Sequence, residues 1–135
     1  MVFPMTMVEK KTTYRFYEYA LDSDWTVLAG RTDADNDQLS IKVAKPNDWW
    51  FHVRGMPGSH AILQGKPGEE PDQKIIKQAA AVAAYHSKAR EGGVVAVSGT
   101  LAKYVTKPRG AKPGSVHIRK EKVFKVRPGI PKEDV

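Results

Sequence analysis

The sequence contains no cysteine among its 135 residues. This absence excludes disulfide bonds, thiolate metal ligands and cysteine nucleophiles, and it is compatible with a reducing cytoplasm. No stretch approaches the run of about eighteen apolar residues that a membrane-spanning helix needs. Residues 1–8 (MVFPMTMV) have no basic n-region or small-residue cleavage site, and Pro4 interrupts them. We therefore expect neither a membrane segment nor a signal peptide, and a cytoplasmic location.

Acidic residues are nearly absent from the C-terminal part of the chain. Residues 103–127 hold nine lysines and arginines against one acid, Glu121, within a chain of formal charge +7. Residues 22–48 have the opposite character, with six aspartates. A polarised basic surface indicates a polyanionic partner, nucleic acid first. The alternative is a lysine-rich face that only contacts solvent.

The length and the apolar content of 41% suit one folded domain with its own core. Aromatic and β-branched runs bounded by turn residues predict several short strands, the first two forming a hairpin across residues 21–24. The last two are predicted to pair as a second hairpin across residues 120–122. The predicted strands are 14–19, 25–29, 49–53, 60–64, 94–98 with a continuation over 101–105, 116–119 and 123–126.

One long helix is predicted after residue 72. Asp72 is a good N-cap, and apolar residues from Ile75 to Ala83 recur at helical spacing. We expect Gly92 and Gly93 to end this helix and the basic residues 86–90 to form its last turn, where they complement the helix dipole. Residues 38–44 fit a strand and a helix equally well, behind five residues rich in capping side chains. Pro46 ends that segment.

Residues 48–60 (DWWFHVRGMPGSH) run from an aromatic strand into a turn with functional side chains. Arg54 could fork onto a phosphate, and Ser59 and His60 could hydrogen-bond one. A metal site would need His52, His60 and Asp48 to converge, and no third strong ligand stands at a known spacing. A Ser59–His60 nucleophile is disfavoured because neighbours on a strand point to opposite faces.

The loop at residues 107–114 (KPRGAKPG) places three cations among two prolines and two glycines. Proline and glycine fix an irregular backbone, which would hold the charges outward, and glycine lets backbone N–H groups approach a phosphate. The Walker spacing is absent. Tyr104 and Tyr85 could offer stacking platforms for bases.

The run NDWWFHVRGMPGSHAIL resembles the signature of the NFACT-R domain family. Three further motifs occur in the same order as in that family: residues 36–46, the helix AAAVAAYHSKAR at 79–90, and the basic loop at 103–114. The resemblance covers roughly residues 14–128. It implies RNA binding, and it implies that residues 38–44 form a helix. It also implies a relation to ribosome quality-control factors that hold tRNA on a stalled large subunit.

Two departures limit what the resemblance implies. The chain has no counterpart of the N-terminal tRNA-handling domain or the coiled-coil arm of those factors, so C-terminal tailing is not implied. Gly55 stands where many relatives have an acidic residue, which makes the turn less negative and more flexible.

Together these observations predict an α+β domain. A mixed or antiparallel sheet of short strands packs against one long and one shorter helix, over residues 13–128 between a flexible N-terminal tail (1–12) and a C-terminal tail (129–135). We expect a stand-alone, non-enzymatic module that binds tRNA or ribosomal RNA, with the ribosome as a further partner, DNA as an alternative ligand, and no metal or cofactor. The alternatives are a nuclease or RNA-modification enzyme using His52 and His60, and a ribosome-associated protein adaptor. The predicted contacts to RNA are Arg54, Ser59, His60, Lys103, Lys107, Arg109 and Lys112.

Overall fold

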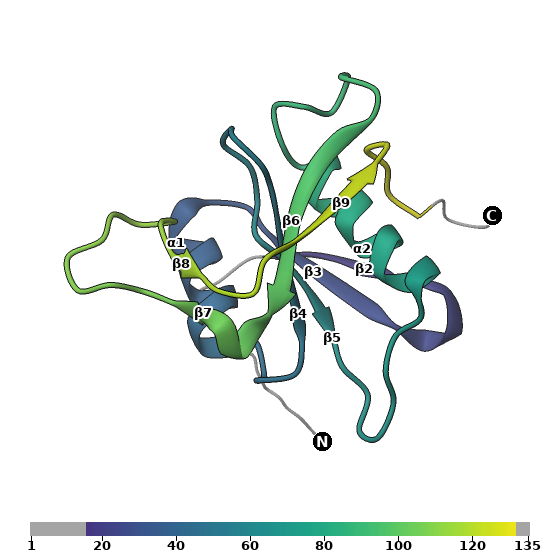
Figure 1. Cartoon of the computed structure of the whole chain (residues 1–135), viewed down its shortest axis with the longest axis horizontal. Helices are drawn as coiled ribbons and strands as arrows, with labels where there is room; N and C mark the ends of the chain where they lie inside the picture. The colour runs from purple at the N-terminus through teal and green to yellow at the C-terminus, as the bar shows by residue number, and fades with distance from the viewer. Residues whose placement is uncertain (1–15, 132–135) are drawn as a thin grey trace, which may run out of the picture.

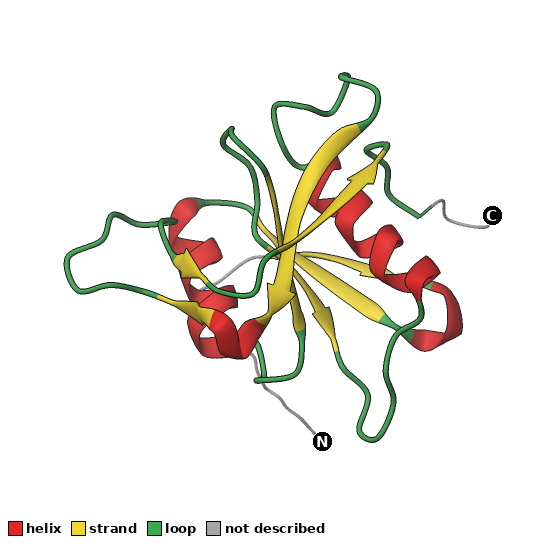
Figure 2. Ribbon diagram, in the orientation of Figure 1, coloured by secondary structure: helices red, strands yellow, loops and turns green. Residues whose placement is uncertain are grey.

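The computed structural model describes residues 16–131 and shows one six-stranded antiparallel sheet with helices on both faces (Figures 1 and 2). The strand order is β2-β3-β5-β4-β6-β9. The predicted α+β class is confirmed. The strands of this sheet are β2 (Phe16–Ala20), β3 (Thr26–Gly30), β4 (Trp49–Val53), β5 (Ala61–Gln64), β6 (Val95–Leu101) and β9 (Lys122–Val126).

The predicted N-terminal hairpin is confirmed. β2 and β3 pair antiparallel, with Phe16 opposite Gly30, and the short 3-10 turn η2 (Asp22–Asp24) joins them. Two residues of this turn, Ser23 and Asp24, adopt positive φ angles of 58° and 64°. After the hairpin the chain first forms β4, which leaves one strand position open next to β3. It then turns back, and β5 fills the position between β3 and β4.

The aromatic strand β4 is central, and its side chains alternate between the two faces. Phe51 is fully buried under α2, whereas Trp50 is buried on the opposite face. Trp49 is half-buried and stacks on Phe51 with 5.9 Å between ring centroids. Burial of these rings on both faces holds β4 at the centre of the sheet.

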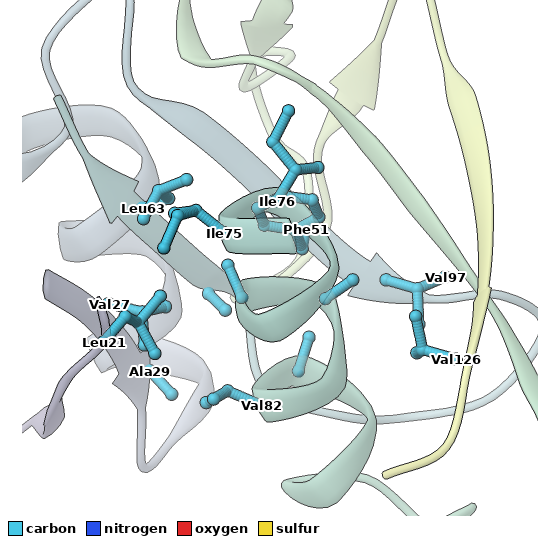
Figure 3. Packing of buried hydrophobic residues seen from close by; sticks show 14 of the residues in the cluster. Leu21, Val27, Ala29, Phe51, Leu63, Ile75, Ile76, Val82, Val97 and Val126 are labelled. Atoms are coloured by element: carbon cyan, nitrogen blue, oxygen red, sulfur yellow. The ribbon is translucent and has the colours of Figure 1, made fainter. Parts of the chain in front are cut away.

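The long helix α2 (Gln73–Tyr85) covers one face of the sheet (Figure 3). The Asp72 side chain accepts a hydrogen bond from the backbone N–H of Ile75 at 3.0 Å, which confirms the predicted cap. Fully buried alanines such as Ala79 and Ala83 bring the helix axis close to Phe51 and Val97.

The predicted end of this helix at Gly92 and Gly93 is wrong. The helix ends at Tyr85, and His86 leaves helical geometry with φ −93° and ψ 42°. The backbone of Ser87 instead forms an isolated antiparallel bridge with Gly58. This tertiary pairing outweighs the helix propensity of residues 86–90, which therefore do not form a last helical turn.

The opposite face is covered by a shorter helical segment. α1 (Asp33–Asp37) continues into the π-helical turn η3 (Gln38–Val43), so the ambiguous segment is helical, as the family resemblance implied. Its N-cap is Thr32, whose hydroxyl accepts from the Asp35 N–H at 3.0 Å. Leu39 of η3 packs with Trp50 and Ile62 in a second buried cluster.

The predicted C-terminal hairpin is also wrong. After the 3-10 turn η4 (Ala102–Tyr104), a two-stranded ribbon forms from β7 (Val105–Thr106) and β8 (His117–Ile118). β9 pairs with β6 and not with β8. The alternating pattern identified both segments as strands, but their partners depend on tertiary contacts such as that of Val105 with the second cluster.

The predicted domain boundaries remain a prediction. The predicted N-terminal tail lies outside the described residues, and Gly129, at the start of the predicted C-terminal tail, donates its N–H to the carbonyl of Ala81 at 3.1 Å. Within residues 16–131, every helix is too short or too polar to cross a membrane.

Candidate nucleic-acid interface

The basic loop is the tip of a hairpin, here called the basic hairpin (residues 103–120). It contains six lysines and arginines and no acidic residue. Its stem is the β7–β8 ribbon, which projects with its long loop from the sheet (Figure 1). At the base of the stem, the Arg119 N–H donates to the carbonyl of Tyr104 at 3.0 Å.

Two tight turns follow one another at the tip. Ala111 N–H donates to the Pro108 carbonyl at 3.1 Å, and Ser115 N–H donates to the Lys112 carbonyl at 3.0 Å. The third residue of each turn is a glycine with positive φ, 80° at Gly110 and 85° at Gly114. Glycine at this place is the signature of a type II turn. Proline and glycine thus define the backbone, as the sequence predicted.

Lys107 does not face solvent in the way the sequence predicted. Its ammonium group donates to the carbonyl of Lys112 and, at 2.9 Å, to that of Ser115, which are the two ends of the second turn. It also forms an ion pair with Asp37 of α1 at 3.1 Å. Three partners surround this ammonium, so the structure uses Lys107 to shape the loop.

Two further side chains fix Gly114 at the centre of the second turn. Its N–H donates to the carboxylate of Asp37 at 3.0 Å, and its carbonyl lies 3.0 Å from Nε2 of His60. A side chain at residue 114 would place its Cβ 3.0 Å from the carboxylate of Asp33. Glycine is therefore required both by its φ angle and by this close approach to α1.

His60 belongs to a buried chain of hydrogen bonds. Trp50 Nε1–H donates to the Ser40 hydroxyl at 3.0 Å, and that hydroxyl lies 2.7 Å from His60 Nδ1. Because the Gly114 carbonyl can only accept, Nε2 of His60 carries the proton and Nδ1 accepts from Ser40. Burial lowers the pKa of His60 to about 4, with the nearby His52 acting in the same direction, so the ring is neutral at pH 7.

The other predicted residues of the central turn lie at different depths. Ser59 is half-buried, and its hydroxyl donates to the Gly30 carbonyl at 2.5 Å. His60 is deeper, with only 3% of its surface exposed. The side chain of Arg54 is 52% exposed and forms an ion pair with Glu121 at 3.3 Å. Glu121 also accepts from the Ser98 hydroxyl. Gly55 has a φ of +76° and open space around it.

Tyr104 lies among three cations at the base of the basic hairpin. Lys103, Arg119 and Lys120 place their charged groups 5.6, 5.2 and 5.8 Å from the centre of its ring. All three cations are exposed and the ring is half-buried. An aromatic ring bordered by cations suits a nucleotide, whose base can stack while its phosphate is neutralised.

The geometry does not favour a metal or nucleophilic centre at the histidines. Within residues 16–131, no group of three or more His, Asp or Glu side chains is arranged to hold a metal ion. Both ring nitrogens of His60 have hydrogen-bond partners, and Asp48 caps the backbone N–H groups of Lys45 and Gly65.

The central turn and the basic hairpin are joined in the structure, because His60 of the turn binds the loop of the hairpin. Arg119 and Lys120 were absent from the predicted site, although the basic count over residues 103–127 included them. The burial of His60 had a signal in the sequence. It stands two residues before Ile62, so strand alternation places both side chains on the same buried face.

Comparisons with known proteins agree with this architecture. Residues 14–120 match the family described as the NFACT protein RNA binding domain. The chain is 41% identical over 98 residues to the Rqc2 homolog RqcH of Bacillus subtilis, and 38% identical over 109 residues to that of Streptococcus suis. It is 27% identical over 81 residues to the ribosome quality control complex subunit NEMF homolog of Drosophila melanogaster.

A solved structure has the same fold. The C-terminal part of the fibronectin/fibrinogen-binding protein of Streptococcus suis superimposes with a TM-score of 0.78 at 35% identity, over 92% of this chain and 49% of that one. The matches to the two RqcH proteins cover 73% and 81% of this chain but only 17% and 19% of theirs. The chain belongs to the NFACT RNA-binding domain family.

Proposed function

We propose that this protein is a non-catalytic RNA-binding module that holds tRNA or ribosomal RNA on its basic hairpin. Exposed cations at the tip and at the base of the hairpin neutralise phosphates, and Tyr104 stacks on an unpaired base. The cations assigned to phosphates are Lys103, Arg109, Lys112, Arg119 and Lys120.

The observation that carries this proposal is the fixed geometry of the loop. Lys107, Asp37 and His60 hold the second turn at both ends and at its centre, while Arg109 and Lys112 stay exposed. A loop that is already ordered loses little conformational entropy when it binds a ligand. Rigid backbone with outward cations is therefore a reason to expect RNA binding and not merely a solvated surface.

Three of the predicted contacts take a different role in this proposal. His60 and Lys107 position the loop from below, and Ser59 anchors the central turn to Gly30. Arg54 keeps a role in contact with RNA, because more than half of its side chain is exposed beside Glu121. Its guanidinium could reach a phosphate once RNA competes with that carboxylate.

The relatives suggest which RNA to test first. The name of the Drosophila relative refers to ribosome quality control, which makes tRNA and large-subunit ribosomal RNA the first ligands to test. The chain spans less than a fifth of those RqcH proteins, so their other activities are not included in the proposal.

A salt series with labelled tRNA tests the proposal directly. If about five phosphates are engaged, the plot of log affinity against log salt should have a slope near −3.5 for single-strand contacts or −4.5 for duplex contacts. A variant with Arg109→Ala, Lys112→Ala and Arg119→Ala should lose affinity and give a shallower slope. The matched control is a triple variant of exposed lysines elsewhere, at Lys42, Lys77 and Lys125.

A flat salt response, or equal losses in the two triple variants, would contradict the proposal. Competition with duplex and single-stranded DNA of the same sequence measures whether the 2′-hydroxyl matters. Cleavage of the labelled RNA that Lys107→Ala retains and His52→Ala abolishes would favour the nuclease alternative.

A further inference from the structure

A second concave site is lined by residues outside the basic hairpin. It is an open surface depression of about 380 Å³, hereafter the cavity, lined by β2, by residues 31–36 after β3, by residues 57–59 of the central turn, and by residues 86–90 after α2. None of its lining residues belongs to the basic hairpin. A cavity of this size is in the range of pockets that hold a small ligand.

The walls of this cavity are held together by backbone contacts. Ser59 N–H donates to the His86 carbonyl at 2.9 Å, where the chain leaves α2. Gly58 permits this approach, because a Cβ at that residue would lie 2.8 Å from the Cβ of Ser87. The Pro-Gly-Ser segment thus forms one wall of the cavity while His60, the next residue, faces the basic hairpin.

Three exposed cations line the cavity: Arg31, Lys88 and Arg90. Within residues 16–131, none of them forms an ion pair. The lining contains one acidic residue, Asp33, so the three cations leave it a net positive charge. The cavity is therefore positively charged and suited to an anionic ligand.

Two of the cations are oriented by aromatic rings. The guanidinium of Arg31 lies 4.8 Å above the ring centre of Tyr17, and that of Arg90 lies 4.0 Å above Tyr85. Arg90 Nε also donates to the Tyr85 carbonyl at 2.6 Å. A guanidinium held flat on a ring keeps its outer N–H edge for a phosphate, which it can bind with two parallel hydrogen bonds.

Stacked rings form the floor beneath Arg31. Tyr17 stacks on His86 with 4.1 Å between centroids and 11° between planes, and the Tyr19 hydroxyl lies 2.6 Å from His86 Nε2. Burial and the neighbouring Arg90 lower the pKa of His86 to about 4, so the imidazole is neutral at pH 7. The outer face of the Arg31 guanidinium is then a platform on which a base can stack.

We propose that this cavity binds one nucleoside monophosphate unit, with its phosphate on Lys88 and Arg90 and its base on the Arg31 guanidinium. The unit is either a free nucleotide or one residue of an RNA chain. Binding of an RNA residue rests on the proposed function, whereas binding of a free nucleotide does not.

Titration of the full chain with cytidine and adenosine monophosphates, followed by amide NMR, tests the site. We expect saturable shifts at residues 31, 58–59 and 88–90, and smaller shifts with inorganic phosphate alone, which lacks a base. Lys88→Ala should weaken nucleotide binding about tenfold, the loss of one charge-assisted hydrogen bond. Lys77→Ala, on the exposed side of α2, removes the same charge and should leave binding unchanged.

The two sources of the ligand are separated by repeating the experiment with a short single-stranded RNA. If Lys88→Ala and Arg31→Ala weaken both the mononucleotide and the RNA, the cavity holds one residue of the bound chain. If they weaken only the mononucleotide, the ligand is a free nucleotide. Failure of the basic-hairpin triple variant to affect RNA would contradict the proposed function and leave the mononucleotide result unchanged.

Two results would overturn the cavity proposal. One is a pattern of nucleotide shifts confined to the basic hairpin. The other is equal affinity in Lys88→Ala and Lys77→Ala for the mononucleotides. Arg31 is exposed, so the amide spectrum of Arg31→Ala should match that of the wild type away from residue 31. This match shows that the variant is folded.

Discussion

The face of the sheet beneath α2 is closed by hydrocarbon, whereas the opposite face contains a buried chain of polar groups beneath the basic hairpin. On the first face, alanines of α2 pack on Phe51 and Val97 without directional bonds. On the second, Trp50, Ser40 and His60 each bind the next group in line and end on the backbone of Gly114.

The two faces therefore contribute differently, one to the stability of the fold and the other to the orientation of the loop. Apolar packing contributes free energy in proportion to the area buried, but it does not fix a loop in one orientation. A buried polar chain contributes less to stability and is sensitive to the loss of any member, because the remaining partners stay buried and unsatisfied. We infer that the α2 face maintains the fold and that the polar face orients the surface proposed to bind RNA.

The largest expected effect is on the apolar face. Phe51→Ala removes a fully buried ring and should lower the free energy of unfolding by about 3–5 kcal/mol. Urea denaturation with a far-UV signal measures this loss. RNA affinity measured on the folded fraction should be close to that of the wild type. A large loss of affinity in fully folded Phe51→Ala protein would show that the two faces are not separable.

The second largest expected effect is a loss of stability in acid, through His60 on the polar face. The folded pKa of His60 is lowered from 6.5 to about 4, so the unfolded state takes up a proton first as pH falls. The contribution of the neutral ring to stability is complete above pH 6.5 and is lost between pH 6.5 and 4, by up to roughly 3 kcal/mol. The pKa values of His52 and His86 are also lowered, and they act in the same direction.

Urea denaturation at several pH values between 7.5 and 4 measures this dependence, with His60→Ala as the comparison. The variant is expected to be less stable at pH 7.5 and to lose less stability on acidification than the wild type. The matched control is His117→Ala, which removes an exposed imidazole from the basic hairpin. Parallel pH curves for His60→Ala and the wild type would contradict the assignment of this titration to His60.

Part of this comparison could be predicted from the sequence. The spacing of apolar residues after Asp72 predicted α2 and its cap, and the aromatic run predicted β4, because both signals are local. The end of α2 and the partners of β8 and β9 were mispredicted, because they depend on pairing with Gly58, β7 and β6, which no local pattern encodes.

The sequence predicted the exposure of some candidate contact residues and not of others. Arg109 and Lys112 were predicted to be exposed and are exposed. Lys107 has the same charge and the same Pro/Gly neighbourhood, yet its ammonium is directed inward by Asp37, seventy residues earlier. A flexible lysine can reach partners in any direction, so sequence alone cannot decide between these two roles.

Lys107→Ala should have a smaller effect than acid, and it acts on the loop alone. The variant loses the hydrogen bonds that join Lys112 and Ser115 and the ion pair with Asp37, at a cost of about 1 kcal/mol. The Gly114 amide, which donates to Asp37, should then exchange with solvent faster. Hydrogen exchange followed by NMR measures this opening. Unchanged exchange at Gly114 would show that the turn is held without Lys107.

Arg109→Ala should have the smallest effect on stability of these changes. It tests most directly whether the two faces of the sheet have separate roles. It removes the same charge as Lys107→Ala, but its guanidinium is exposed and makes no ion pair within the described residues. Stability should change by less than about 0.5 kcal/mol, and Gly114 exchange should not change. The salt slope of RNA binding should become shallower by about 0.7 to 0.9, the contribution of one phosphate. If Arg109→Ala instead accelerated exchange at Gly114 and left the salt slope unchanged, Arg109 would belong to the support of the loop, and contact with phosphate would pass to Lys112 and the cations around Tyr104.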